Sequence, residues 1–208
     1  MDECVVLVHG LWLNSLAMYP LHARLARSGF QVQRFGYASV RSTPERNIDR
    51  LRRAIQAVRA KRIHLVGHSL GGVLIMHALA KDPDPRIARA VLLGAPVAGS
   101  HAGRSLARSR GGRWMLGESL PLWSAGKAPE APAGIEVGVL AGDLPIGLGR
   151  IVAHLPKGND GVVALAETRV VGAADSLVLR VNHTGMIFSG ALAQQVCTFL
   201  KEGRFAHA

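Results

Sequence analysis

The chain has 208 residues, of which 49% are hydrophobic and 19% are charged, a balance that lets one domain bury a sizeable core. Its 24 glycines and 10 prolines are spread along the sequence, so a disordered or collagen-like chain is excluded. Lysine and arginine outnumber the acids by 25 to 14, giving a net charge of +11. Because only 5% of the residues are aromatic and no zinc-finger spacing occurs, nucleic acid is not expected as a partner.

Apolar runs typical of β-strands recur along the whole chain. They are Cys4–Val8, Gln31–Gly36, Ile63–Val66, Ala90–Leu93, Ile135–Ala141 and Ser176–Val181. Helices are predicted directly after Ser42 and Thr43, where Pro44 suits a first turn, and over Leu70–Leu79 and Gly190–Lys201. This alternation predicts an α/β fold, a three-layer α/β/α sandwich with a mostly parallel sheet of about six strands.

Between residues 99 and 134 the alternation stops, and arginine, glycine, serine and proline become frequent. We expect an insertion here, within a single domain that spans residues 1–208. Trp114 and Trp123 lie in this segment. They either anchor the insertion to the body of the protein or cover a hydrophobic cleft as a lid would.

The strongest local signal is the sequence Gly67-His68-Ser69-Leu70-Gly71, which stands between an apolar strand and a helix. A serine hydroxyl becomes a nucleophile when it is exposed beside a base, and a sharp strand-to-helix turn presents it at the carboxyl edge of a sheet. We therefore expect Ser69 to be a nucleophile. The backbone N–H of Leu70 is expected to face the developing oxyanion, and His68 to line the site.

The first apolar strand ends in His9-Gly10-Leu11. Gly10 permits a sharp turn after the strand, and the N–H of Leu11 is the expected second oxyanion donor. His9 is expected to brace this loop by hydrogen bonding and not to transfer protons. The loop after the first strand is therefore predicted to support chemistry at the serine.

A base and an orienting acid are expected later in the chain, in the order serine, acid, histidine. Of the nine histidines, His183 combines a late position with a polar loop after a strand. Asp143 directly follows a strand, whereas Asp160 lies in a glycine-flanked turn, and both remain candidates for the acid. His64 and His68 are four residues apart but lie across a strand and a turn without a third ligand, so no metal site is expected.

Taken together, these residues resemble the α/β-hydrolase superfamily, and within it the compact lipases and esterases. The likeness covers nearly the whole chain and rests on His9-Gly10, Gly67–Gly72, Asn159–Val163 and Asn182-His183, in the order typical of the family. The segment Gly94–Ser100 also looks like one found in many bacterial and phospholipid-directed lipases. It differs from the commoner lipase form, because Val97 stands where that form has histidine.

The resemblance implies a serine hydrolase that cleaves carboxylic esters through an acyl-enzyme and needs no cofactor. Ser69 would attack the acyl carbonyl, His183 would take its proton, and Asp160, favoured by the resemblance, would hold the imidazole. A small-molecule or lipid-like ester is the expected substrate. An acyltransferase or thioesterase on the same triad, or a catalytically silent hydrolase-fold binding protein, are the alternatives.

Two arginine-rich stretches, Arg46–Arg62 and Arg104–Arg113, predict a peripheral contact with anionic membranes. The N-terminal sequence lacks the basic and long apolar regions of a signal peptide, and no apolar run reaches the roughly 18 residues of a membrane span. Cys4 and Cys197, at opposite ends of the chain, match no disulfide framework. We therefore expect a cytoplasmic protein with reduced thiols.

Overall fold

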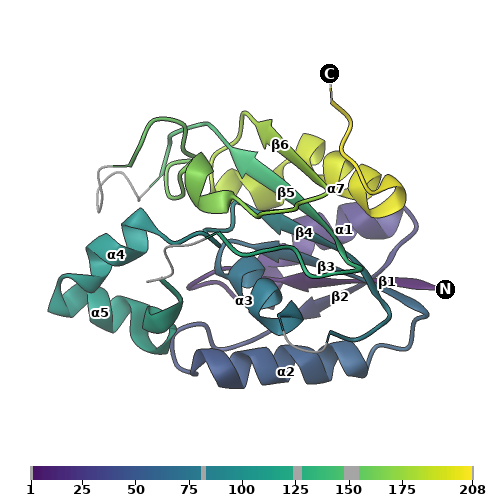
Figure 1. The fold of residues 1–208 in the computed structure, drawn as a ribbon, viewed down its shortest axis with the longest axis horizontal. Helices are drawn as coiled ribbons and strands as arrows, with labels where there is room; N and C mark the ends of the chain where they lie inside the picture. Colours follow the sequence, from purple (N-terminus) through teal and green to yellow (C-terminus); the bar gives the residue numbers. More distant parts are fainter. Residues whose placement is uncertain (1, 81–82, 124–127, 148–154, 208) are drawn as a thin grey trace.

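The computed structural model describes residues 2–80, 83–123, 128–147 and 155–207 and contains a six-stranded sheet with helices on both faces (Figure 1). All neighbouring strands are parallel, in the order β2-β1-β3-β4-β5-β6. The predicted α/β sandwich with about six strands is confirmed. The strands are β1 (Glu3–Val8), β2 (Gln31–Phe35), β3 (Arg62–His68), β4 (Ile87–Leu93), β5 (Glu136–Gly142) and β6 (Asp175–Leu179).

Each predicted apolar run overlaps one of these strands, and the predicted helix Leu70–Leu79 has the same bounds as α3. The α-helices are α1 (Tyr19–Arg27), α2 (Pro44–Gln56), α3 (Leu70–Leu79), α4 (His101–Ala107), α5 (Arg110–Leu116) and α7 (Gly190–Glu202). Short 3-10 helices are η1 (Ser15–Met18), η2 (Gly117–Trp123), η3 (Leu165–Thr168) and η4 (Thr184–Phe188). The sequence analysis did not predict α1, α4 or α5.

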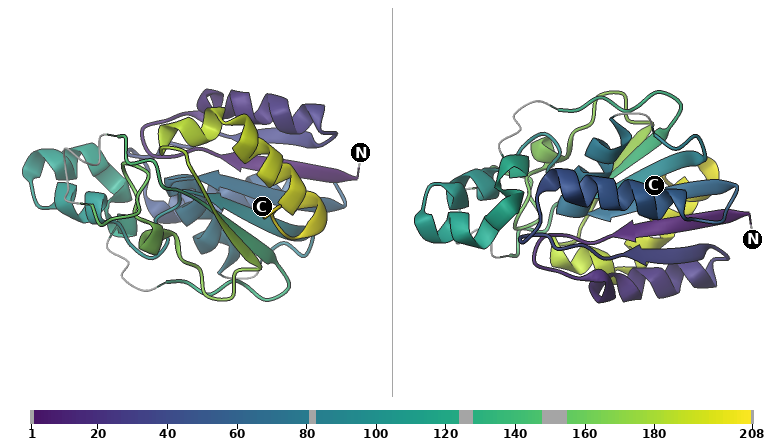
Figure 2. Two further views of the ribbon diagram at one scale, coloured as in Figure 1. Left: turned by 90° about the horizontal axis from the view of Figure 1, so that it is seen from above. Right: turned by 90° about the horizontal axis from the view of Figure 1, so that it is seen from below.

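Both faces of the sheet are buried, which explains why its strands are continuous apolar runs. In β1, Cys4, Val6 and Val8 pack into a core with residues of α2 and α3. Val5 and Leu7 point to the opposite face and pack with residues of α1 and α7. Figure 2 shows these two helical layers on either side of the sheet.

In the segment predicted as an insertion, residues 124–127 lie outside the described residues, and residues 101–123 form α4, α5 and η2, which lie beyond the carboxyl ends of the strands (Figures 1 and 2). Each of the two helices starts at a serine, since the hydroxyl oxygens of Ser100 and Ser109 accept hydrogen bonds from N–H groups in the first turns. The two tryptophans of this segment differ in their exposure to solvent. Trp123 is buried and donates to the hydroxyl of Ser119 at 3.0 Å, so it anchors the segment, whereas Trp114 is exposed.

His64 lies on β3 and is completely buried on the face covered by α1 and α7. Neither of its ring nitrogens has a hydrogen-bond partner among the described residues, and the nearest carboxylate oxygen, from Glu3, is 3.6 Å from Nε2. Burial lowers the pKa of His64 to about 4, although Glu3 partly opposes this effect. The folded protein therefore holds this imidazole in its neutral form.

We expect this histidine to make the fold acid-sensitive. The folded-state pKa of about 4 lies below the ordinary 6.5, so as the pH falls below 6.5 the unfolded chain takes up a proton that the folded protein refuses. Between pH 7 and pH 4, the free energy of unfolding should fall by about 3 kcal/mol more in the wild type than in His64→Leu. Urea unfolding at both pH values measures the difference, and equal losses in the two proteins would contradict it.

Candidate active site

Ser69 occupies the sharp turn between β3 and α3. Its backbone has φ of 53° and ψ of −123°, a conformation that residues other than glycine rarely adopt. The turn is held by a hydrogen bond from the N–H of Ser69 to the carbonyl oxygen of Leu93, at 2.9 Å. A Cβ atom at Gly67 would lie 2.6 Å from the backbone nitrogen of Gly72, so the turn closes only with glycine there.

The loop that follows β1 lies directly against this turn. A Cβ atom on Gly71 would overlap the carbonyl oxygen of Val8 and come within 2.5 Å of that of His9. A Cβ atom on Gly10 would lie 3.0 Å from the Cβ of Ser69. Three segments therefore meet without intervening side chains: the end of β1, the serine turn and the start of α3.

The contacts of His9 fit the bracing function expected for it. Its Nε2 accepts a hydrogen bond from the N–H of Tyr37 at 3.3 Å, so the proton is on Nδ1, which lies 2.9 Å from the carbonyl oxygen of Gly10. The Tyr37 hydroxyl donates to the His9 carbonyl oxygen at 2.9 Å, and the two rings stack with centroids 4.3 Å apart. Burial lowers the pKa of His9, which keeps the imidazole neutral.

His183 and Asp160 lie in contact although 23 residues separate them. The Nδ1 of His183 is 2.7 Å from Oδ2 of Asp160, whose side chain is only 1% exposed. The other carboxylate oxygen accepts hydrogen bonds from the N–H groups of Val162 and Val163, at 2.9 and 2.7 Å. With its proton held on Nδ1, His183 has a free Nε2 that makes no hydrogen bond to a described residue.

Asp143, the other candidate acid, follows β5 as the sequence suggested. Its backbone N–H donates to the carbonyl oxygen of Leu179 at 3.1 Å, which aligns it with the end of β6. Its Oδ1 is buried and has no hydrogen-bond partner within the described ranges. The acid that the structure brings to His183 is therefore Asp160.

His68 joins the serine turn to the His183 loop. Its Nε2 lies 3.0 Å from the carbonyl oxygen of His183, and since a carbonyl can only accept, the proton is on Nε2. The two imidazole rings are tilted, with centroids 4.8 Å apart. Burial lowers the pKa of His68 to about 3, so the ring is neutral and adds no positive charge beside His183.

The two expected oxyanion donors belong to the serine turn and to the loop that lies against it. Leu70 is the first residue of α3, so its N–H has no acceptor within the helix and lies at the positive end of the helix dipole. Leu11 begins the loop after β1, and the next residue, Trp12, has a φ of 59°. The Trp12 N–H donates to the hydroxyl of Ser39 at 3.1 Å, and its indole N–H donates to the carbonyl oxygen of Met115 at 2.9 Å. The loop is thereby tied to α5.

A buried acid outside the predicted set holds the start of α4. Glu167 is 3% exposed; its carboxylate accepts hydrogen bonds from the backbone N–H of Ala164, at 2.7 Å, and from that of His101. The Nδ1 of His101 is 2.7 Å from the same carboxylate. Nothing in the sequence pairs two residues that are 66 positions apart, although the serine cap at Ser100 could have revealed the helix start.

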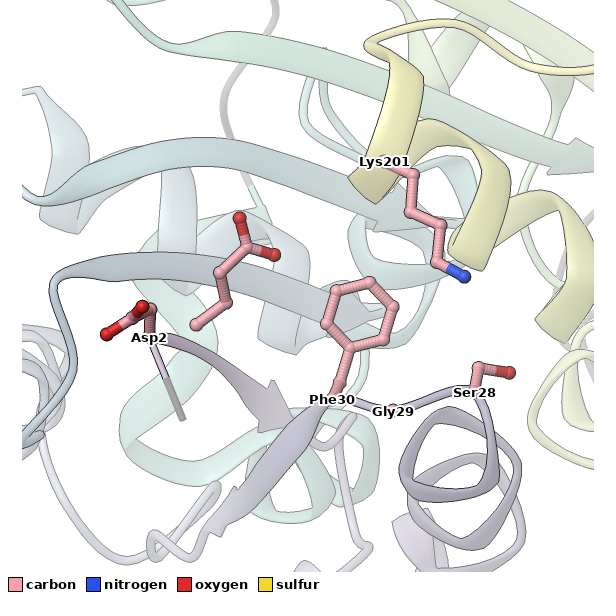
Figure 3. A pocket seen from close by; sticks show the side chains of 6 residues that line it. Asp2, Ser28, Gly29, Phe30 and Lys201 are labelled. Carbon is pink, nitrogen blue, oxygen red and sulfur yellow. The ribbon is translucent and has the colours of Figure 1, made fainter.

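One cavity, of about 270 Å³, lies far from these residues (Figure 3). It is lined by Asp2, Glu3, Ser28, Gly29, Phe30 and Lys201, which surround the amino ends of β1 and β2. The serine turn and the His183 loop lie at the opposite, carboxyl edge of the same parallel sheet. This cavity is therefore separate from the candidate active site.

Comparison with solved structures gives the same fold at low sequence identity. A metagenomic carboxyl esterase matches with a TM-score of 0.68 and 20% identity, covering 89% of this chain and 65% of its own. The enol-lactonase from Burkholderia xenovorans LB400 has a TM-score of 0.67 and 17% identity, covering 97% and 92%. An esterase from Pyrococcus furiosus has a TM-score of 0.66 and 17% identity, covering 96% and 82%.

Among curated proteins, the probable esterase PIR7A of Oryza sativa subsp. indica is 33% identical over 113 residues. That match covers 49% of this chain and 43% of the rice protein, so the chain spans less than half the length of that relative. The model of the alpha/beta hydrolase family matches a much longer part, residues 5–192, which includes most of β1, the serine turn, Asp160 and His183. By this match and by its sheet, the chain belongs to the alpha/beta hydrolase family.

Proposed function

We propose that the protein hydrolyses carboxylic esters, with Ser69 as nucleophile, His183 as general base and acid, and Asp160 as the group that orients the imidazole. The observation that carries this proposal is the 2.7 Å contact between His183 and Asp160, in a loop that His68 joins to the serine turn. A base so oriented beside a serine on a sharp turn is the arrangement that acyl transfer requires.

In the proposed mechanism, the Nε2 of His183 takes the proton of the Ser69 hydroxyl as Oγ attacks the ester carbonyl. The imidazolium that forms is stabilised by the Asp160 carboxylate, and the negative oxygen by the N–H groups of Leu11 and Leu70. His183 then gives its proton to the departing alkoxide, leaving an acyl group on Ser69. Water, deprotonated by the same Nε2, then attacks the acyl carbonyl; the bond to Oγ breaks, the acid is released, and Ser69 takes the proton back from His183.

Esters with an apolar acyl group are the proposed substrates, since the loop that lies against the serine turn at Gly10 continues with the apolar residues Leu11 and Trp12. The rice relative and two of the structural neighbours are named as esterases, which supports an ester substrate over an amide.

We propose the cytoplasm as the location of the protein. The two cysteines, Cys4 and Cys197, are free thiols, which fits a reducing compartment.

Covalent labelling tests the nucleophile directly. We expect a fluorophosphonate probe to label the native protein on Ser69, because such probes react with serines activated by a neighbouring base. Peptide mass spectrometry locates the adduct, and Ser69→Ala serves as the unlabelled control. Turnover of p-nitrophenyl esters of increasing acyl length then measures the size of the acyl pocket.

The outcomes separate the alternatives. Labelling on Ser69 with ester turnover supports an ester hydrolase. Labelling on Ser69 without turnover of any ester would instead favour an acyltransferase or a thioesterase, in which the same triad serves another acceptor or donor. Absence of labelling in folded protein would contradict the proposal and favour a catalytically silent binding protein.

A further inference from the structure

The tip formed by α4 and α5 exposes large apolar side chains to solvent. Trp114 is 84% exposed and its neighbour Met115 is 42% exposed. A tryptophan carries one of the largest apolar surfaces of any side chain, so leaving it in water forgoes the stabilisation that burial gives. Such exposure on a helix indicates a surface that binds another protein or a membrane.

The same tip is strongly basic. Between residues 101 and 123 there are four arginines, Arg104, Arg108, Arg110 and Arg113, and a single acid, Glu118. Within the described part of the chain, no carboxylate lies at ion-pair distance from any of these arginines. Their positive charge is therefore available to an external anion.

Packing and a hydrogen bond fix the tip against the rest of the protein. Leu116, at the end of α5, is buried, and the indole N–H of Trp12 donates to the Met115 carbonyl oxygen at 2.9 Å. A Cβ atom on Gly112 would overlap the carbonyl oxygen of Leu106, so α5 packs on α4 without a gap. Trp114 is thus held in water by the packing around it.

Further exposed apolar side chains lie at the same edge of the sheet. All of them lie in segments that follow the carboxyl ends of the parallel strands. These side chains are Trp12, Leu16, Tyr19, Ile146 and Phe188. Because the carboxyl ends of parallel strands share one edge, these side chains lie at the edge that also carries Ser69 and His183. In Figure 2 the helices α4 and α5 project outward from that edge.

We propose that this tip binds the surface of membranes that contain anionic phospholipids. Trp114 and Met115 enter the interfacial layer, while Arg108, Arg110 and Arg113 contact the lipid phosphates, a combination typical of helices that lie on a membrane. None of the helices in the described ranges is long and apolar enough to cross a bilayer. The contact is therefore peripheral, and it turns the edge that carries Ser69 toward the lipid.

The second arginine-rich stretch, on and after α2, lacks the apolar half of this combination. Arg46, Arg53 and Arg59 are exposed there, but no large hydrophobic side chain is exposed among residues 44–62. This stretch consequently offers a control, since three exposed arginines can be removed from it as from the tip, but it has no apolar anchor.

Sedimentation with vesicles tests the proposal, using Ser69→Ala protein so that lipid hydrolysis cannot alter the vesicles. We expect binding to vesicles of phosphatidylcholine and phosphatidylglycerol that falls steeply with salt, and a blue shift of tryptophan fluorescence. Changing Arg108, Arg110 and Arg113 to glutamine should weaken binding on the order of 100-fold. Trp114→Ser should weaken it about tenfold and abolish most of the blue shift.

The control triple variant, with Arg46, Arg53 and Arg59 changed to glutamine, should bind within about threefold of the parent, because residues 44–62 expose no large hydrophobic side chain that could enter the lipid. Equal weakening by the two triple variants would overturn the proposal in favour of general electrostatic attraction. Absence of vesicle binding at low salt would also overturn it. In that case, self-association in sedimentation velocity that Trp114→Ser abolishes would assign the tip to a second copy of the chain.

Discussion

Replacing Asp160 with asparagine is expected to lower kcat for ester hydrolysis about 10,000-fold with little change in stability. The amide fills the same space, but its NH₂ group can face Nδ1 of His183 only if that nitrogen gives up its proton. The proton then moves to Nε2, the atom that must accept the serine proton, so the base is lost. Kinetics with a p-nitrophenyl ester measure the loss, and circular dichroism checks the fold.

Asp143→Asn is the matched control for this prediction. Asp143 directly follows β5, and its Oδ1 has no hydrogen-bond partner among the described residues. We expect kcat to change less than about threefold, because no charge beside the imidazole is removed. A larger loss in Asp143→Asn than in Asp160→Asn would show that the acid has been assigned to the wrong residue.

The second large effect is expected from Gly71→Ala. The added methyl group would overlap the carbonyl oxygens of Val8 and His9, which belong to the buried end of β1 and the loop beside it. Relief requires the backbone to shift, which should lower the free energy of unfolding by about 3 kcal/mol. The same shift moves the expected oxyanion donor Leu11, so kcat should fall at least about 100-fold.

Gly111→Ala separates this clash from the ordinary effect of alanine in a helix. Gly111 lies in α5, where a Cβ atom would meet nothing within 4 Å. There alanine should raise the free energy of unfolding by about 0.5 kcal/mol, because glycine is the poorer helix former. Urea unfolding of both variants checks the opposite signs, and destabilisation of similar size in the two proteins would refute the packing argument.

The sheet and α3 could be predicted because their signals are local. A strand buried on both faces reads as an apolar run, and α3 starts at the turn that the glycines around Ser69 demand. The helices α4 and α5 escaped prediction because Gly103, Gly111 and Gly112 lower helix propensity. Gly103 and Gly112 are present for close packing, since a Cβ atom there would overlap Trp123 and Leu106, contacts that a single sequence does not display.

The candidate site shows the same division between local and distant information. The motif around Ser69 and the strand before His183 are local signals, and the structure has a turn and a loop at these places. The acid was open between Asp143 and Asp160 on the residues alone, because spacing does not reveal which loop returns to the imidazole. The bonds of Trp12 to Met115 and of Glu167 to His101 join residues more than 60 positions apart and left no sequence pattern.

Trp12 and Ser69 are, within the described ranges, the two residues other than glycine that have positive φ. Each such backbone costs roughly 1–3 kcal/mol, which glycine in the same place would largely avoid. Selection for thermostability alone would therefore favour glycine at both positions. At position 69 this substitution would remove the serine hydroxyl. The trade-off between a robust fold and a working enzyme is concentrated in two neighbouring turns.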